Sequence, residues 1–207
     1  MNEQPMRTIV TVISFLFLSG PLSGQDFGWW NNKHDWDGVT PWQNYLIMAP
    51  AYLGPNALPV PEHGPARIGS SPSLEMAAEY HHSPGDRTSD IRGRLSFPVC
   101  SYAELSIHGV FSEWYRMDTL TRDIRRARDR DGEGQSLGDV LISTRIRLSK
   151  ARKGIPDAVL GIHLKTASGN NLSAARFTDS PGYWFDLSLS KDYMAGGKTN
   201  LTPFMQV

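Results

Sequence analysis

Three segments between residues 137 and 193 alternate apolar with polar residues. Residues 140–149, 158–165 and 183–190 each carry an apolar or β-branched residue at every second position, with mostly polar or charged residues between. Successive side chains of a strand point to opposite faces, so each segment predicts a strand with one apolar and one polar face. Strands of this length occur in soluble β-sandwiches and in membrane-spanning β-barrels. The alternation therefore indicates an all-β fold and leaves these two architectures open.

The connections between predicted strands favour the barrel. Weaker alternation predicts further strands at about 73–82, 89–97 and 102–113, and one beginning near Asn200, which makes about seven in all. Every second connection is short, and the others are longer, clearly so at 116–136 and 167–182. Bacterial outer-membrane barrels have this asymmetry, with tight periplasmic turns and long external loops. We therefore expect an antiparallel up-and-down transmembrane β-barrel over residues 73–207.

The N-terminus has the order of features of a secretory signal. Arg7 precedes the uncharged run 8–18, and small and turn-forming residues follow up to Gly24. This run is too short for a helix that crosses a hydrocarbon core of about 30 Å. Residues 1–24 are therefore expected to be a cleaved signal peptide, and Gln25 stands where a lipoprotein would carry its lipidated cysteine. Cys100 is the only cysteine, so no intrachain disulfide can form.

The remaining composition excludes some classes of function. Lys and Arg together number 21, as do Asp and Glu, so the clustered basic excess of a nucleic-acid-binding protein is absent and no such partner is expected. Residues 25–72 are rich in Trp, Asn, Pro and Gly and are left as an unassigned N-terminal segment. The predicted last strand breaks off at Val207 without a terminal aromatic residue. We therefore expect an incomplete barrel, from a fragment or a truncated gene product.

Several stretches of the chain are similar to one known class of protein. They are DGEG followed by GD within 131–139, LKTASGNN at 164–171, TDSPGYWFDLSLSK at 178–191, and DFGWWNNKHDWDGVTPWQNY at 26–45. The chain resembles the N-terminal part of an uncharacterised family of porin-like outer-membrane β-barrel proteins of Gram-negative bacteria. The resemblance implies a location in the cell outer membrane, with the lipid bilayer and the barrel-assembly machinery as partners. It implies no particular activity.

The polar faces of the predicted strands would line the barrel lumen. The lumen-lining candidates are Glu75, Glu79, Arg92, Arg94, Glu104, His108, Arg145, Arg147, His163, Lys165 and Asp186. Glu79 is expected roughly opposite Arg92, because the intervening turn is expected between Gly85 and Asp86. One interpretation is that paired charges fill a narrow barrel. The other is a basic constriction that selects anionic solutes, formed by Arg92, Arg94, Arg145, Arg147 and Lys165.

Other candidate sites are weaker. Asp129, Asp131 and Glu133 lie in the long polar connection and faintly resemble a calcium loop, but lack the first Asp and the distal Glu of an EF-hand. A solvated loop with one helical turn is the alternative for this connection. His81 and His82 are adjacent, so they point to opposite faces of a strand, with His81 inward. Aromatic residues at strand ends are expected to form interfacial girdles, namely Tyr102, Trp114, Tyr115, Tyr183 and Tyr193.

Three functions remain open from the sequence. The first is a passive outer-membrane barrel, either porin-like or structural, without a cofactor. The second is an exported soluble β-sandwich that binds a glycan or another ligand, with the Trp-rich segment as its stacking surface. The third is an outer-membrane hydrolase, whose site would be assembled in space from residues such as His108, His163, Asp186 and Ser188. The sequence contains no recognised catalytic motif, so catalysis is not expected.

Overall fold

The computed structural model describes residues 26–60, 65–195 and 199–207, so the predicted signal peptide lies outside the described residues. The chain divides into two compact units, Met1–Gly38 and Val39–Val207. In the first unit, helix α2 (Gly28–Lys33) buries Trp30, whose ring centroid lies 5.2 Å from that of His34. Within the described ranges, no helix has the length and apolar character needed to span a membrane.

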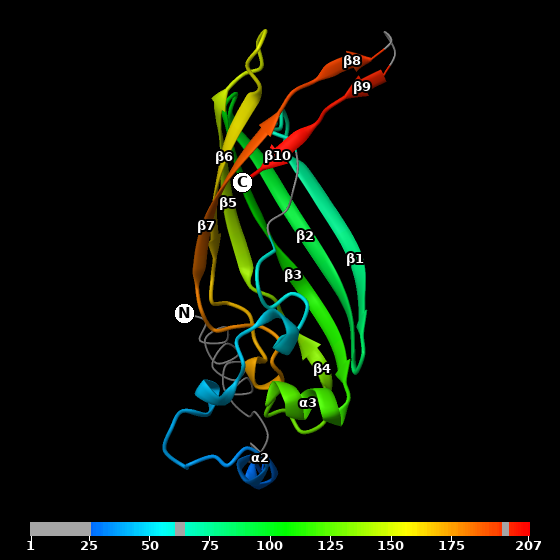
Figure 1. The fold of residues 1–207 in the computed structure, drawn as a ribbon, viewed down its shortest axis with the longest axis vertical. Coiled ribbons are helices and arrows are strands. Elements are labelled where there is room, and N and C mark those ends of the chain that lie inside the picture. The colour runs from blue at the N-terminus through cyan, green and yellow to red at the C-terminus, as the bar shows by residue number, and fades with distance from the viewer. Residues whose placement is uncertain (1–25, 61–64, 196–198) are drawn as a thin grey trace, which may run out of the picture. The chain divides into compact units, whose positions relative to one another are not determined.

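The second unit is built on an eight-stranded antiparallel sheet in the order β1-β2-β3-β5-β6-β7-β10, with β4 also paired to β3 (Figure 1). Strands β8 and β9 pair only with each other. All-β structure is confirmed, and each of the first six predicted strands coincides with a strand of the sheet. The expected last strand is divided between β9 and β10. The bounds are β1 (Ser73–Ser83), β2 (Asp86–Cys100), β3 (Ala103–Met117), β4 (Glu133–Ser136), β5 (Val140–Ser149), β6 (Asp157–Lys165), β7 (Gly182–Ser190), β8 (Tyr193–Ala195), β9 (Thr199–Leu201) and β10 (Phe204–Gln206).

The sheet is curled (Figure 1), and its two faces differ in the polarity of their side chains. The concave face buries polar side chains, among them Asp86, Thr88, Asp90, Ser106, Glu113, Ser143, Lys165, Asp186 and Ser188. The convex face exposes large apolar side chains, among them Leu74, Met76, Ile91, Leu95, Ile107, Phe111, Ile162, Leu164 and Phe185. A water-soluble domain ordinarily has the reverse arrangement.

An irregularity in β3 decides which of its residues face inward. The register between β2 and β3 shifts where Ile91 pairs with Ser112 but Arg92 pairs with Val110, so Phe111 is an extra residue. A β-bulge of this kind resets the alternation of side chains that follow it. Glu113 and Tyr115 therefore turn to the concave side, where both are buried. A regular strand would have put them on the apolar face.

The β1–β2 turn differs from its predicted position. Ser83 pairs with Asp86, so only two residues separate the strands and the turn centre lies one residue earlier than expected. Gly85 lies in this turn with a φ of +78°, a conformation that favours glycine. Glu79 consequently pairs with Asp90 and not with Arg92. The Glu79 carboxylate still reaches Arg92 diagonally, with 3.0 Å between Oε1 and Nη1.

The long connections are more ordered than expected. The connection after β3 contains helix α3 (Thr119–Arg125), followed by β4, in place of a solvated loop with one turn. A 3-10 helix, η3 (Leu172–Ala174), lies in the connection after β6, and η1 (Trp42–Tyr45) and η2 (Pro50–Tyr52) precede β1. A small apolar core joins these segments near α3. It consists of Leu53, Ala57, Met117, Ala127 and Ala175, with Leu58 packed against it.

Candidate functional site

The concave face of the sheet holds a cavity of about 370 Å³. Its walls come from β1, β2, β3, β5, β6 and β7, and residues 55–60 cover part of it. Nine of the eleven predicted lumen-lining residues line this cavity, namely Glu79, Arg92, Arg94, Glu104, His108, Arg145, His163, Lys165 and Asp186. Glu75 is exposed on β1, and the Arg147 guanidinium donates to the carbonyl oxygen of Ser101 (2.9 Å). These two residues lie outside the cavity lining.

Several charges of the cavity are paired. Arg92 contacts Glu79, and the Lys165 ammonium lies 2.6 Å from the Asp139 carboxylate. Lys165 Nζ also donates to the hydroxyl of Thr178 (2.9 Å). The cavity lining contains four carboxylates, from Glu79, Glu104, Asp139 and Asp186, and four permanently basic side chains, from Arg92, Arg94, Arg145 and Lys165. Equal numbers of acidic and basic side chains favour the interpretation that paired charges fill the space over the interpretation that basic residues form a constriction.

The N-terminal segment left unassigned from the sequence contacts the concave side of the sheet. The backbone N–H of Ala66 donates to the Ser190 hydroxyl (3.0 Å), and that of Gly69 donates to the Glu104 carboxylate (2.7 Å). The carbonyl oxygen of Pro65 accepts from Arg145 (3.0 Å). These contacts reach β3, β5 and β7, so residues 65–69 supply hydrogen-bond partners to inward-facing polar groups of three strands. The sequence offered no local signal of them.

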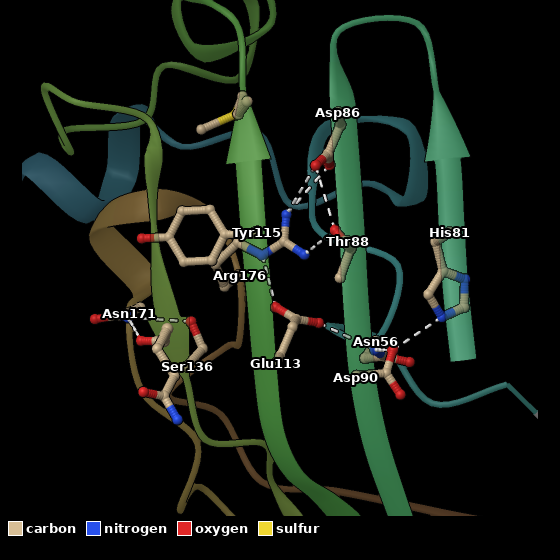
Figure 2. Close-up of polar contacts among 12 residues, drawn as sticks. Asn56, His81, Asp86, Thr88, Asp90, Glu113, Tyr115, Ser136, Asn171 and Arg176 are labelled. Atoms are coloured by element: carbon tan, nitrogen blue, oxygen red, sulfur yellow. Dashed lines mark hydrogen bonds and ion pairs between the residues drawn. The ribbon is translucent and has the colours of Figure 1, made fainter. Parts of the chain in front are cut away.

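A buried arginine is at the centre of a polar network near α3 (Figure 2). Arg176, fully buried in the connection after β6, donates from Nε to Glu113 (2.7 Å) and from Nη2 to the Thr88 hydroxyl (2.7 Å). Its Nη1 lies 3.2 Å from the Asp86 carboxylate, and its guanidinium carbon lies 4.8 Å from the Tyr115 ring centroid. These contacts fasten the long connection to β2 and β3. Sequence reasoning did not identify Arg176.

Two buried carboxylates opposite each other are bridged by an amide. Asp90 and Glu113 are cross-strand partners, and Asn56 Nδ2 donates to both, at 2.9 and 3.0 Å (Figure 2). His81 Nε2 lies 3.0 Å from the same Asp90 oxygen. His81 therefore faces inward, as predicted. The amide and imidazole reduce the repulsion of neighbouring carboxylates that burial would otherwise strengthen.

In the part of the chain that the structure describes, one group of three side chains has ligand atoms close enough to hold a metal ion. It consists of Glu79, His81 and Asp90, whose ligand atoms lie within 4.8 Å of one another. The calcium candidates are not brought together in this way. Asp129 accepts the phenolic hydrogen of Tyr115 (2.9 Å), Asp131 is exposed, and Glu133 lies 3.4 Å from Arg116 at the surface.

The aromatic residues predicted to form girdles differ in exposure. Tyr102 is exposed in the turn between β2 and β3, and Trp114 and Tyr183 are exposed on β3 and β7, whereas Tyr115 is buried against Arg176. The prediction for Tyr115 was wrong because the bulge at Phe111 turns it to the concave side. The side chain of Tyr193 lies outside the described part of the structure.

Ser143, His163 and Asp186 form a continuous row of contacts on the cavity wall. Ser143 Oγ lies 2.8 Å from His163 Nδ1, and His163 Nε2 contacts a carboxylate oxygen of Asp186. The Ser188 hydroxyl donates to the other Asp186 oxygen (3.2 Å). Of the four residues named for a spatially assembled hydrolase, His163, Asp186 and Ser188 thus meet, and His108 lines the same cavity. Ser143 was not among them.

Comparison with models of protein families, with curated proteins and with solved structures found no match to this chain.

Proposed function

We propose that this protein is an outer-membrane β-barrel protein, acting as a porin-like passive channel or as a structural barrel. The observation that carries the proposal is the inverted polarity of the curled sheet. Its concave face buries Asp, Glu, Ser, Thr and Lys side chains, while its convex face exposes Leu, Ile, Phe, Tyr and Met. Lipid-facing strands of membrane barrels alternate in this sense, with apolar residues outward and polar residues inward.

Free energies of transfer support a lipid environment for the convex face. Burying apolar surface contributes roughly 25 cal/mol per Å², so large exposed patches are uncommon on soluble monomers. Ile162, Leu164 and Phe185 are 37%, 45% and 61% exposed on adjacent strands β6 and β7. Contact with hydrocarbon would remove this surface from water. It would also explain why the strands keep polar residues on the side away from lipid.

The lengths of the connections also support an outer-membrane barrel. The two long connections carry α3, β4 and η3, whereas β2–β3 and β5–β6 are joined by short connections at the opposite strand ends. In an outer-membrane barrel the long connections face outward and the short ones face the periplasm. The two-residue β1–β2 turn lies at the long-loop end, and the connection from β7 to β10, which carries β8 and β9, lies at the other end. The sorting therefore rests on the long connections after β3 and β6 and the short ones after β2 and β5.

The alternative of a soluble sandwich receives less support. A sandwich buries the apolar inner faces of two packed sheets. In the described residues, the concave face is polar, and the segments that cover it are loops, short helices and extended chain. The paired charges of the cavity favour a structural or narrow barrel over a wide, selective pore.

Fractionation tests the location directly. The full chain, expressed with its own N-terminus in a Gram-negative host, should sediment with outer membranes, resist extraction by alkaline carbonate and dissolve in detergent. On unboiled gels it should migrate as a compact band that shifts on heating, because the strands stay paired in detergent. Recovery in the soluble periplasmic fraction, with one mobility before and after heating, would contradict the proposal.

A further inference from the structure

We propose that Ser143, His163 and Asp186 form a catalytic triad that hydrolyses small carboxylic esters inside the cavity. The three residues lie on adjacent strands, on β5, β6 and β7 respectively. All three line the cavity, so a substrate entering it could contact the serine hydroxyl. This activity goes beyond the proposed membrane barrel and does not depend on it.

Strand register places the serine beside the histidine. Ser143 and His163 are direct cross-strand partners of β5 and β6, and both point to the concave face. Their contact, 2.8 Å from Oγ to Nδ1, is within the range from which a histidine can take a serine proton. The residues are 20 positions apart in sequence, which is why no local motif marks them.

The hydrogen bonds fix the tautomer that catalysis requires. An ionised carboxylate only accepts hydrogen bonds, so when the imidazole is neutral the contact between Asp186 and His163 Nε2 places its single hydrogen on Nε2. The lone pair of Nδ1 then faces the Ser143 hydroxyl. Serine proteases use the same logic with the two ring nitrogens exchanged, and the roles are recognised by geometry and not by sequence position.

Two neighbours hold the imidazole in place. The Trp184 ring stacks on His163, with centroids 4.8 Å apart and an angle of 8° between planes. Gly161 is the cross-strand partner of Asp186, and a Cβ there would lie 2.6 Å from His163 Nε2 and even nearer the Asp186 carboxylate. Glycine thus leaves the space in which the histidine and aspartate meet. Trp184 and Gly161 are positioning residues.

The reaction balances with water as the only co-reactant. Ser143 Oγ attacks the ester carbonyl carbon while its proton moves to His163 Nδ1, and Asp186 stabilises the resulting imidazolium. Collapse of the tetrahedral intermediate breaks the bond to the alcohol oxygen, which takes that proton. Water then hydrolyses the acyl-serine by the same two steps. Arg145, two residues along β5 in the same cavity, supplies positive charge for the developing oxyanion.

A fluorophosphonate probe tests the nucleophile. An activated serine forms an Oγ–P bond with it and expels fluoride, so we expect mass spectrometry of the folded full chain in detergent to find the label on Ser143. Hydrolysis of p-nitrophenyl acetate should be lost in Ser143→Ala and fall by about 100-fold or more in His163→Gln. Gly161→Ala should also lower the rates of labelling and of ester hydrolysis, because it disturbs the His163–Asp186 contact without removing a polar group.

Ser96→Ala is the matched control. Ser96 is a buried serine of β2 that pairs with Ser106 of β3 and is not among the residues that line the cavity, so its loss should leave labelling and hydrolysis unchanged. Each variant is first compared with the parent protein by far-UV circular dichroism, which reports folding whether or not the protein is a membrane barrel. Absence of label from Ser143 in the folded parent protein would overturn the proposal. Equal labelling or hydrolysis in folded Ser143→Ala would do so too, and neither result would alter the fractionation test of location.

Discussion

On the convex side of β6 and β7, Ile162, Leu164 and Phe185 are exposed, whereas on the concave side of β5 and β7, Ser143 and Asp186 are 3% and 9% exposed. Along each of these strands the residues of the two faces alternate, as Phe185 and Asp186 do on β7. Ser143 and Asp186 on the polar side make hydrogen bonds within the protein, whereas the apolar residues remain exposed to solvent among the described residues. This difference supports our proposal that the convex face contacts hydrocarbon.

The largest expected effect comes from removing the central cation of the concave side. Arg176→Met leaves Glu113 and Asp86 buried without their shared guanidinium, which should lower the free energy of unfolding by about 3–5 kcal/mol. Arg116→Met is the control, because its contact with Glu133 is exposed and should contribute at most about 1 kcal/mol. Urea unfolding of both variants in detergent micelles measures the difference. Equal decreases in the free energy of unfolding would mean that the buried contacts of Arg176 stabilise the fold no more than an exposed ion pair does.

The next prediction concerns the convex side. Phe185→Arg should destabilise the folded barrel in lipid by about 2–4 kcal/mol if the residue lies near the bilayer midplane. Leu120→Arg, at a 67% exposed position on α3 away from the sheet, should have little effect. Refolding yield into vesicles, read from the heat-dependent gel shift, compares the two. A neutral result for Phe185→Arg would indicate that this face meets water.

A smaller effect would sharpen the interpretation of the cavity. If the cavity conducts ions, Arg145→Gln removes one of its positive charges and should shift permeability toward cations in planar bilayers. Arg147→Gln is matched in strand and charge, but this residue does not line the cavity and should change selectivity less. Identical selectivity in Arg145→Gln and the parent protein would rule out a selective role for this arginine.

The smallest expected effect lies outside both faces, at the start of α3. The backbone N–H of Thr121 donates to the Asp118 carboxylate (2.7 Å) and holds the pKa of that group below its usual range. A lowered folded-state pKa means that the cap stabilises α3 above the ordinary aspartate range and is lost as pH falls through the lowered value. NMR Cα shifts of residues 119–125 should report this fraying. Asp118→Asn, which keeps an acceptor oxygen but does not titrate, should show no such pH dependence.

The strands were predictable because alternation is a local property of sequence. The bulge was not, since Phe111 looks like one more apolar residue of a regular strand, and its effect on Glu113 and Tyr115 follows only from pairing with β2. Nine cavity-lining residues were foreseen from the same alternation. Arg176 was not, because it lies in a connection and its partners are 63 to 90 residues away.

The contact between Ser143 and His163 was harder to predict than the strands and easier than the contacts of Arg176. Each lay on a predicted strand, and only the register between β5 and β6 was needed to bring them together. The short connection 150–156 would have allowed that register to be estimated from the sequence. The contacts of residues 55–60 and 65–69 with the concave face could not be predicted in this way, because a Pro- and Gly-rich segment carries no periodicity.

The contacts of this covering segment also constrain the order of folding. The Ala66 amide bonds to Ser190, 124 residues later in the chain, and Asn56 bonds to β2 and β3. Contacts of such long range form slowly, because the loop between the partners must close first. The segment precedes every strand in the chain, yet it reaches its last partner only when β7 has joined the sheet. The concave side of the sheet must therefore remain accessible to this segment until β7 has paired. Docking of the segment is then one of the final steps of folding.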